Sequence, residues 1–282
     1  MLLFIGMIIG LILGLTGAGG SVFAVPLLML LAGMPMVDAV GISLGAVAAS
    51  TLYGSLRNLV KKSAAPVLWQ PGVILASAGA VSAPAGKWLG LQLDELWLIS
   101  GFSLLAGVIA LRMWLSAQKN PTAASVVRAG NFSDIPSPGL ICRMNPTGQF
   151  ELRPRCVSGL LIGGLLVGLL SGLFGVGGGF LIVPLLLALS AVSMAQAVST
   201  SLIIIALISG SGFISHLWLG DNHDAIAGST QWITLGLVAA GGVAGMIIGQ
   251  AVSHKIANAL LQKIFAVSLI IVCIITLVRS FL

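Results

Sequence analysis

The sequence contains few charged residues. Of its 282 residues, 7% are charged and 58% are hydrophobic, and the mean hydropathy is +1.13. A soluble globular domain carries about 25% charged residues, so this composition excludes that class. Apolar stretches long enough to cross about 30 Å of hydrocarbon recur along nearly the whole chain. The short alternating strands of a transmembrane barrel are absent. The sequence therefore predicts an all-α polytopic membrane protein.

Chemically reactive groups are equally scarce inside the apolar stretches. All seven acidic residues fall at the ends of these stretches or between them, so no buried carboxylate relay for protons is visible. There is no phosphate-binding GxxxxGK[ST] motif, and no strand precedes GVGGG, which excludes a resident ATPase and a dinucleotide fingerprint. No nucleophile and base pair lies at depth, so we predict no enzyme. The thirteen basic residues lie almost entirely in connections, which is the positive-inside pattern and not a nucleic-acid surface.

Cysteine and histidine each occur three times. Cys142, Cys156 and Cys273 form no CxxC motif, and we expect free thiols. His216, Asp221, His223 and Asp224 lie close together in HLWLGDNHDAI, but their spacing matches no strong metal motif, and we interpret this segment as a solvated connection. We predict neither a metal nor a cofactor. The N-terminal MLLFIGMIIGLILG has no basic region or cleavage site, so we interpret it as a retained membrane segment.

The sequence repeats itself. An offset of 158 residues aligns GLTGAGGSVFAVPLL at 14–28 with GLFGVGGGFLIVPLL at 172–186, and AVGISL at 39–44 with AVSTSL at 197–202. After extra residues near 218–225 the offset becomes 163, which pairs Gly79 with Gly242 and Gly86 with Gly249. The chain is therefore predicted to be a duplicated membrane domain, as transporters often are.

The predicted organisation has three parts. Residues 1–116 form a first transmembrane repeat, 117–156 a linker and 157–282 a second transmembrane repeat. The linker contains five basic residues and several prolines, so we expect it to be cytoplasmic. Each repeat reads as a glycine-interrupted stretch followed by three ordinary spans, at 37–56, 67–90 and 94–116 in the first, and at 195–217, 230–252 and 256–280 in the second.

The interrupted stretch decides the topology. Residues 157–190 would form a helix about 50 Å long, too long for one crossing and too short for two. A helical hairpin that turns at the glycines near mid-membrane fits this length, and with three further crossings it makes the second repeat inverted relative to the first. If the stretch instead crosses once with a bend, the repeats are parallel. The distribution of basic residues favours the inverted arrangement only weakly.

Two kinds of glycine occur in each interrupted stretch. Gly6, Gly10 and Gly14, with their repeat mates, are spaced by four residues and indicate close helix packing. In GAGG and GVGGG the glycines stand adjacent, which packing does not require. Glycine accepts positive φ and close approach of a ligand, and the helix that resumes at Ser21 or Gly179 presents unpaired N–H groups and a positive dipole end. Such an end binds anions.

Hydroxyl side chains on the following spans are candidates to complete the hydrogen-bond shell of an oxyanion. Arg57 and Arg112 are interpreted as topology anchors at span ends. The candidate substrate-binding residues are therefore Gly17, Gly19, Gly20, Ser21, Ser43, Gly175, Gly177, Gly178, Gly179, Ser199, Thr200 and Ser201.

The paired glycine motifs, each followed by AVGISL or AVSTSL, resemble the duplicated signature of the TauE/SafE family of membrane permeases. The resemblance covers residues 1–116 and 157–282. It implies a transporter of sulfite, sulfoacetate or other organosulfonates, commonly an exporter, in a bacterial inner membrane. By this resemblance the glycine motif falls on Gly17, Gly19, Gly20, Gly175, Gly177, Gly178 and Gly179, and the small-polar motif on Ser43, Thr200 and Ser201. The first copy departs from the second in having Ser21 for Gly179 and in lacking a counterpart of Thr200.

We therefore expect a secondary transporter whose small anion binds near mid-membrane at the half-helix N-termini of the two glycine motifs. The expected partners are this anion and the lipid bilayer, with a coupling ion or a homodimer as further possibilities. The alternative is a channel-like or non-transporting membrane protein of the same fold, in which the glycines only serve packing.

Overall fold

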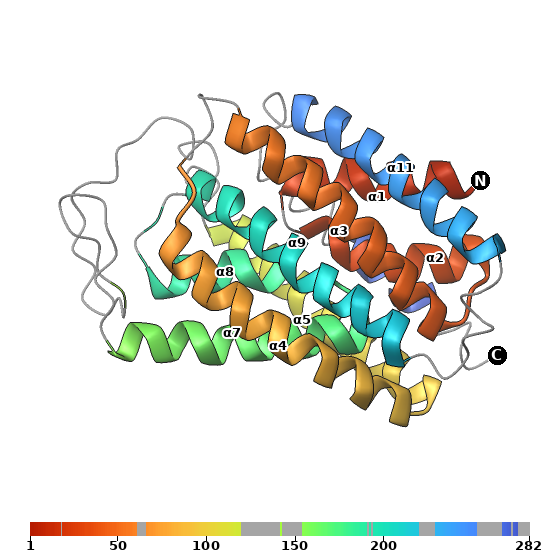
Figure 1. Ribbon diagram of the computed structural model, residues 1–282, viewed down its shortest axis with the longest axis horizontal. Coiled ribbons are helices and arrows are strands. Elements are labelled where there is room, and N and C mark those ends of the chain that lie inside the picture. Colours follow the sequence, from red (N-terminus) through yellow and green to blue (C-terminus); the bar gives the residue numbers. More distant parts are fainter. Residues whose placement is uncertain are drawn as a thin grey trace.

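The computed structural model describes residues 1–17, 19–60, 66–119, 142, 154–190, 192, 194–219, 229–252, 267–271 and 273–275. The described chain is almost entirely helical, as predicted (Figure 1). Within the region of the expected last span, residues 267–271 and 273–275 are helical. The named elements are α1 (Leu2–Thr16), η1 (Gly19–Phe23), α2 (Ala24–Ala32), α3 (Met36–Val60), α4 (Trp69–Gln92), α5 (Glu95–Lys119), α7 (Pro154–Phe174), α8 (Gly179–Leu189), α9 (Met194–Leu219) and α11 (Ser229–Val252).

Each glycine-interrupted stretch folds back on itself. In the second half of the chain, Gly159 faces Leu189 and Gly163 faces Leu185, so α7 and α8 run antiparallel as the two limbs of a hairpin. In the first half, α1 ends at Gly17, and the 3-10 helix η1 brings Gly20 against the backbone of Leu13 before α2 begins. The long apolar stretches are therefore broken into hairpins at the adjacent glycines.

The four-residue glycine ladders are helix-packing surfaces between the two halves of the chain. On α1, Gly6, Gly10 and Gly14 face Val238, Gly242 and Met246 of α11. On α7, the ladder faces equivalent residues of α4 at the same sequence offsets, namely Gly164 against Leu75, Gly168 against Gly79 and Gly172 against Ala83. A side chain at a ladder position would meet backbone atoms of the partner helix, because the helices approach so closely. The first limb of each hairpin thus packs on a helix of the other half.

The centre of the molecule is formed by α3 and α9, which pack against each other (Figure 1). Gly41 near the start of α3 faces His216 near the end of α9, and Gly45 faces Phe213. These contacts show that α3 and α9 run antiparallel. The chain begins at one end of the bundle, whereas α7 begins at the opposite end (Figure 1).

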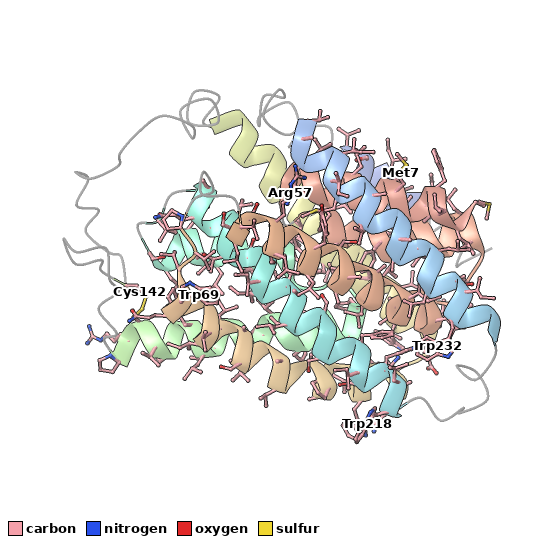
Figure 2. The ribbon with its side chains drawn as sticks, turned by 45° about the horizontal axis from the view of Figure 1, so that its top comes forward. Met7, Arg57, Trp69, Cys142, Trp218 and Trp232 are labelled. Atoms are coloured by element: carbon pink, nitrogen blue, oxygen red, sulfur yellow. A yellow bond between two sulfur atoms is a disulfide. The ribbon has the colours of Figure 1, made fainter. Side chains whose placement is uncertain are left out.

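Helices of membrane-spanning length are present in both halves. By length and composition, Met36–Val60, Pro154–Phe174, Ala195–Trp218 and Trp232–Val252 are apolar and long enough to cross a membrane. Exposed tryptophans lie at or near helix ends, with Trp69 starting α4 and Trp218 near the end of α9 (Figure 2). Tryptophan is enriched at membrane–water interfaces, so these positions fit a bundle with its helix ends at the two interfaces.

One expectation from the sequence is wrong. Cys142 and Cys156 are not free thiols but form a disulfide, while Cys273 is free and buried (Figure 2). The physical reason is that Cys142 lies against the open ends of the second hairpin. Its backbone N–H donates to the carbonyl of Leu189 at the end of α8, 2.9 Å away, and Cys156 lies in the first turn of α7.

The ladder contacts predict opposite effects of the same substitution at two glycines. Gly168→Ala should lower the thermal stability of the purified protein, because the new methyl would collide with the carbonyl of Gly79. Gly236→Ala, at a helix position with nothing within 4 Å, should raise the stability or leave it unchanged, since alanine is the better helix former by about 1 kcal/mol. Thermal unfolding in detergent measures both. Equal effects of the two substitutions would contradict the ladder assignment.

Candidate functional site

The tip of the second hairpin, residues 174–180, is a buried stretch of irregular backbone between α7 and α8. All seven residues are buried. Gly175, Gly177 and Gly178 have φ values of 69°, 68° and 68°, a region that residues with a Cβ rarely adopt. The turn itself therefore requires the adjacent glycines. This requirement explains why GVGGG interrupts an apolar segment.

The tip leaves a run of amide groups without acceptors. The N–H of Gly175 donates to the carbonyl of Ser171 at 2.8 Å and closes the end of α7. Within the described chain, no acceptor bonds the N–H groups of residues 176–180. The N-cap of α8, Gly178, offers no side chain to bond them. Buried amides without partners are rare and unfavourable, so this cluster is suited to an anionic guest.

Two buried hydroxyl groups lie beside these amides. Ser171 on α7 and Ser209 on α9 are each 0% exposed, and the Oγ of neither has a hydrogen-bond partner. Ser209 Oγ lies 2.7 Å from the position that a Cβ on Gly177 would occupy, and Ser171 Cβ lies 3.8 Å from that of Gly178. Since a buried hydroxyl without a partner costs free energy, two of them at one tip point to a ligand that completes their bonding.

The tip is held in place by α3. Ser43 Oγ donates to the carbonyl of Gly175 at 2.8 Å, and both groups are buried. A Cβ on Gly175 would fall 2.8 Å from Cα of Val40, and one on Gly177 would fall 3.1 Å from Val47. The tip therefore lies against the first half of α3. Ser43, which sequence analysis selected as a ligand group, serves here to position the turn.

The first hairpin tip is built differently. Gly17 has φ 74° and donates to the carbonyl of Leu13 at 2.7 Å, and Ser21 is fully buried in η1. The residues equivalent to Ser171 and Ser209 are Leu13, which has no hydroxyl, and Thr51. Thr51 Oγ1 donates to the carbonyl of Val47 on its own helix at 2.7 Å. Unpartnered hydroxyls thus occur at the second tip and not at the equivalent positions of the first.

The two broken segments nevertheless approach each other, because η1 contacts α8. Gly17 packs against Val198 of α9 as Gly175 packs against Val40 of α3, and these pairs are equivalent at the 158-residue offset. The sequence analysis expected the two glycine motifs to converge. The structure brings the 3-10 segment of one motif next to the helix that follows the other.

The hydroxyl motif on α9 is engaged with backbone. Ser201 Oγ donates to the carbonyl of Val198 at 2.8 Å, one turn earlier on its own helix. Thr200 Oγ1 accepts the N–H of Leu68 at 3.0 Å and so fixes the start of α4. Ser199 is buried. Thr200 and Ser201 therefore have structural bonds in place, in contrast to Ser171 and Ser209.

Sequence reasoning missed Ser171 and Ser209. It favoured Ser43 and Ser201 because these two recur in both repeats, whereas the mates of Ser171 and Ser209 are Leu13 and Thr51. One available signal was their proximity to glycines, in LLSGLFG and in ISGSG. A search for polar residues that differ between the repeats would have found them.

The remaining polar candidates lie away from the tip. Arg57 Nη1 lies 3.5 Å from the carbonyl of Ile247 and from Oε1 of Gln250, and so joins the end of α3 to α11 (Figure 2). The side chain of Arg112 and residues Asp221, His223 and Asp224 are outside the described part of the chain. No three His, Cys, Asp or Glu side chains of the described residues form a group suited to a metal ion.

Helical hairpins broken at buried glycines, packed in a bundle of membrane-spanning helices, are characteristic of membrane transporters. The profile of the family described as "Sulfite exporter TauE/SafE" matches residues 2–276. The chain belongs to this family of membrane transporters, and the resemblance found in the sequence is confirmed.

Bacterial relatives cover nearly the whole chain. A "Probable membrane transporter protein" of Xylella fastidiosa (strain Temecula1) is 28% identical over 278 residues, which are 98% of this chain and 93% of the relative. The "Probable membrane transporter protein YunE" of Bacillus subtilis is 27% identical over 281 residues, 96% of this chain and 94% of the relative. No solved structure matches. The chain is thus a multi-pass membrane protein with bacterial relatives described as transporters.

The Ser43 bond predicts a difference between two repeat-related serines. Ser43→Ala should lower the free energy of unfolding by about 1 kcal/mol, because it removes a buried bond between α3 and the hairpin tip. Ser201→Ala should have little effect, since its hydroxyl bonds only its own helix. Thermal or denaturant unfolding of the purified variants measures both. A Ser43→Ala protein as stable as the Ser201→Ala protein would show that α3 does not hold the tip.

Proposed function

We propose that the protein is a secondary transporter of small sulfur-containing anions, namely sulfite, sulfoacetate or other organosulfonates, in a bacterial inner membrane. The family description supports sulfite as the first substrate to test, and the relatives named as transporters support a transport role. The observation that carries the proposal is the buried cluster of unbonded amides and hydroxyls at the second hairpin tip.

In this proposal the anion binds at the amides of Gly177, Gly178 and Gly179. The positive end of the α8 dipole, about half an elementary charge, favours an anion there, and Ser171 and Ser209 donate further bonds to its oxygens. A sulfite or sulfonate group presents three acceptor oxygens, which suits several donors converging from separate helices. The first hairpin, Gly17 to Ser21, closes the site from the other half as one half rocks against the other.

We further propose that the two halves are inverted in the membrane. The antiparallel α3 and α9 occupy equivalent positions in the two repeats, and equivalent helices are antiparallel only when the repeats are inverted. The opposite ends at which α1 and α7 begin support the same arrangement (Figure 1). The N-terminus would then lie outside and the linker at 117–156 in the cytoplasm.

Flux of sulfite into proteoliposomes tests the transport role. The expected result is saturable uptake that sulfoacetate inhibits by competition. Flux that does not saturate would instead indicate a channel, and no flux of any sulfur anion tested would overturn the proposal.

The assigned ligand groups give a separate prediction. Ser171→Ala and Ser209→Ala should each raise the KM for sulfite roughly tenfold, the effect of losing one hydrogen bond to a charged group. Neither should lower the thermal stability, because neither hydroxyl has a protein partner to lose. Thr51→Val, the repeat-related control, should leave the KM unchanged, since its hydroxyl bonds its own helix. Unchanged KM values in both serine variants would rule out this site.

Cysteine labelling tests the inverted arrangement. In a background without the three native cysteines, Leu3→Cys should react with a membrane-impermeant maleimide on intact cells, whereas Gly130→Cys should react only after lysis. Labelling of both on the same side would support parallel repeats. The experiment also resolves a conflict, because the basic linker favours the cytoplasm, while a disulfide such as Cys142–Cys156 persists mainly in oxidising compartments.

A further inference from the structure

Lys87 is a buried cation within a predicted span. It lies in α4 and is 3% exposed. An ammonium group is transferred from water only at a large cost unless an anion or a set of acceptors compensates it. Ionisable side chains inside membrane helices therefore mark functional sites by default. Lys87 falls within the expected span 67–90 and was not among the residues predicted to bind the substrate.

Lys87 lies beside the end of α7. Its backbone nitrogen is 3.0 Å from the position that a Cβ on Gly172 would occupy, and the next residue on α7, Leu173, contacts Gly86. Gly172 precedes Gly175, the first residue of the tip with positive φ, by less than one helical turn. The backbone of Lys87 is therefore close to the hairpin tip. It belongs to α4, the helix against which the glycine ladder of α7 packs.

Titratable groups on two other helices interact electrostatically with Lys87. It interacts electrostatically with Asp38 in the first turn of α3 and with His216 in the last turn of α9. No carboxylate of the described residues forms an ion pair with it within 4.0 Å. The ring of His216 packs on Gly41, and its buried Nδ1 has no partner among the described residues. Lys87 thus has an attractive carboxylate nearby but no direct contact that would neutralise it.

The equivalent positions in the other half are neutral. At the sequence offsets of the repeat, Lys87 corresponds to Gln250, Asp38 to Gln196 and His216 to Asn58. The bundle therefore accommodates a neutral amide at each of these places. Lys87, Asp38 and His216 all lie at one end of the molecule, the end where α3 begins and where α4 and α9 finish (Figure 1).

We infer that Lys87 binds the oxyanion at a second site, in addition to the hairpin tip. This second site lies between the tip and the end of the bundle where α3 begins. Asp38 attracts the Lys87 ammonium group when no anion is present. When an anion is present, Asp38 competes with it for the ammonium group. His216 on α9 is the third titratable group at this end of the bundle. The inference rests on the proposed function, since the guest is the same small sulfur oxyanion.

Kinetics in proteoliposomes test the inference. Lys87→Gln, which copies the residue at the equivalent position, should raise the KM for sulfite at least tenfold, as expected for loss of a charged partner. Lys87→Arg should restore most of the loss because it keeps the charge. Asp38→Asn should lower the KM, because it removes the competing carboxylate. Arg57→Gln is the matched control at the opposite end of α3 and should leave the KM unchanged.

The outcomes separate this inference from the proposed function. Saturable wild-type transport with an unchanged KM in Lys87→Gln would overturn the role of Lys87 and leave the hairpin site intact. A KM raised equally by Arg57→Gln would also overturn it, because the effect would then be one of general charge. If Lys87→Gln fails to fold, the Asp38→Asn variant tests the inference instead. A KM for sulfite that does not fall in Asp38→Asn would contradict it. Absence of transport in the wild-type protein would overturn the proposed function itself.

Discussion

The structure depends on one constraint, that backbone N–H groups shielded from water need acceptors. Most of the described chain meets it with long helices. The second hairpin tip does not, because three glycines at positive φ stop α7 and the amides of residues 176–180 have no acceptor among the residues that the structure describes. In the proposed site an anion bonds several of these amides at once. A chain with 7% charged residues can in this way place polar groups for a ligand inside an apolar bundle.

The two repeats share their helix packing but differ in their buried polar residues. The ladders on α1 and α7 pack on α11 and α4 at equivalent positions, so the halves are joined by two copies of one contact. The polar groups do not follow this symmetry. Ser171, Ser209 and Lys87 have Leu13, Thr51 and Gln250 as mates. A transporter needs a common frame to move one half against the other, but a single anion needs only one fully equipped site.

Much of the fold could be predicted from periodicity and spacing. Expected spans at 37–56 and 195–217 became α3 and α9, and the resumed helix at Gly179 became α8. The expectation of positive φ at adjacent glycines is confirmed at Gly177 and Gly178, whereas Gly19 and Gly20 of the first motif form the 3-10 helix η1. The disulfide, the partner helices of the ladders and the burial of Lys87 could not be predicted, because each depends on contacts between distant segments. Ser171 and Ser209 were missed for a related reason, since a serine in a membrane helix usually bonds its own backbone.

The central claim is that the bare amides of the second tip hold the anion. The most direct measurement is a structure determined with sulfite in the membrane-embedded protein. The account predicts density for the anion within hydrogen-bond distance of the N–H groups of Gly177, Gly178 and Gly179, with the Ser209 hydroxyl turned toward it. An anion bound elsewhere while these amides bond to protein carbonyls, or a continuous helix through residues 174–180, would contradict it.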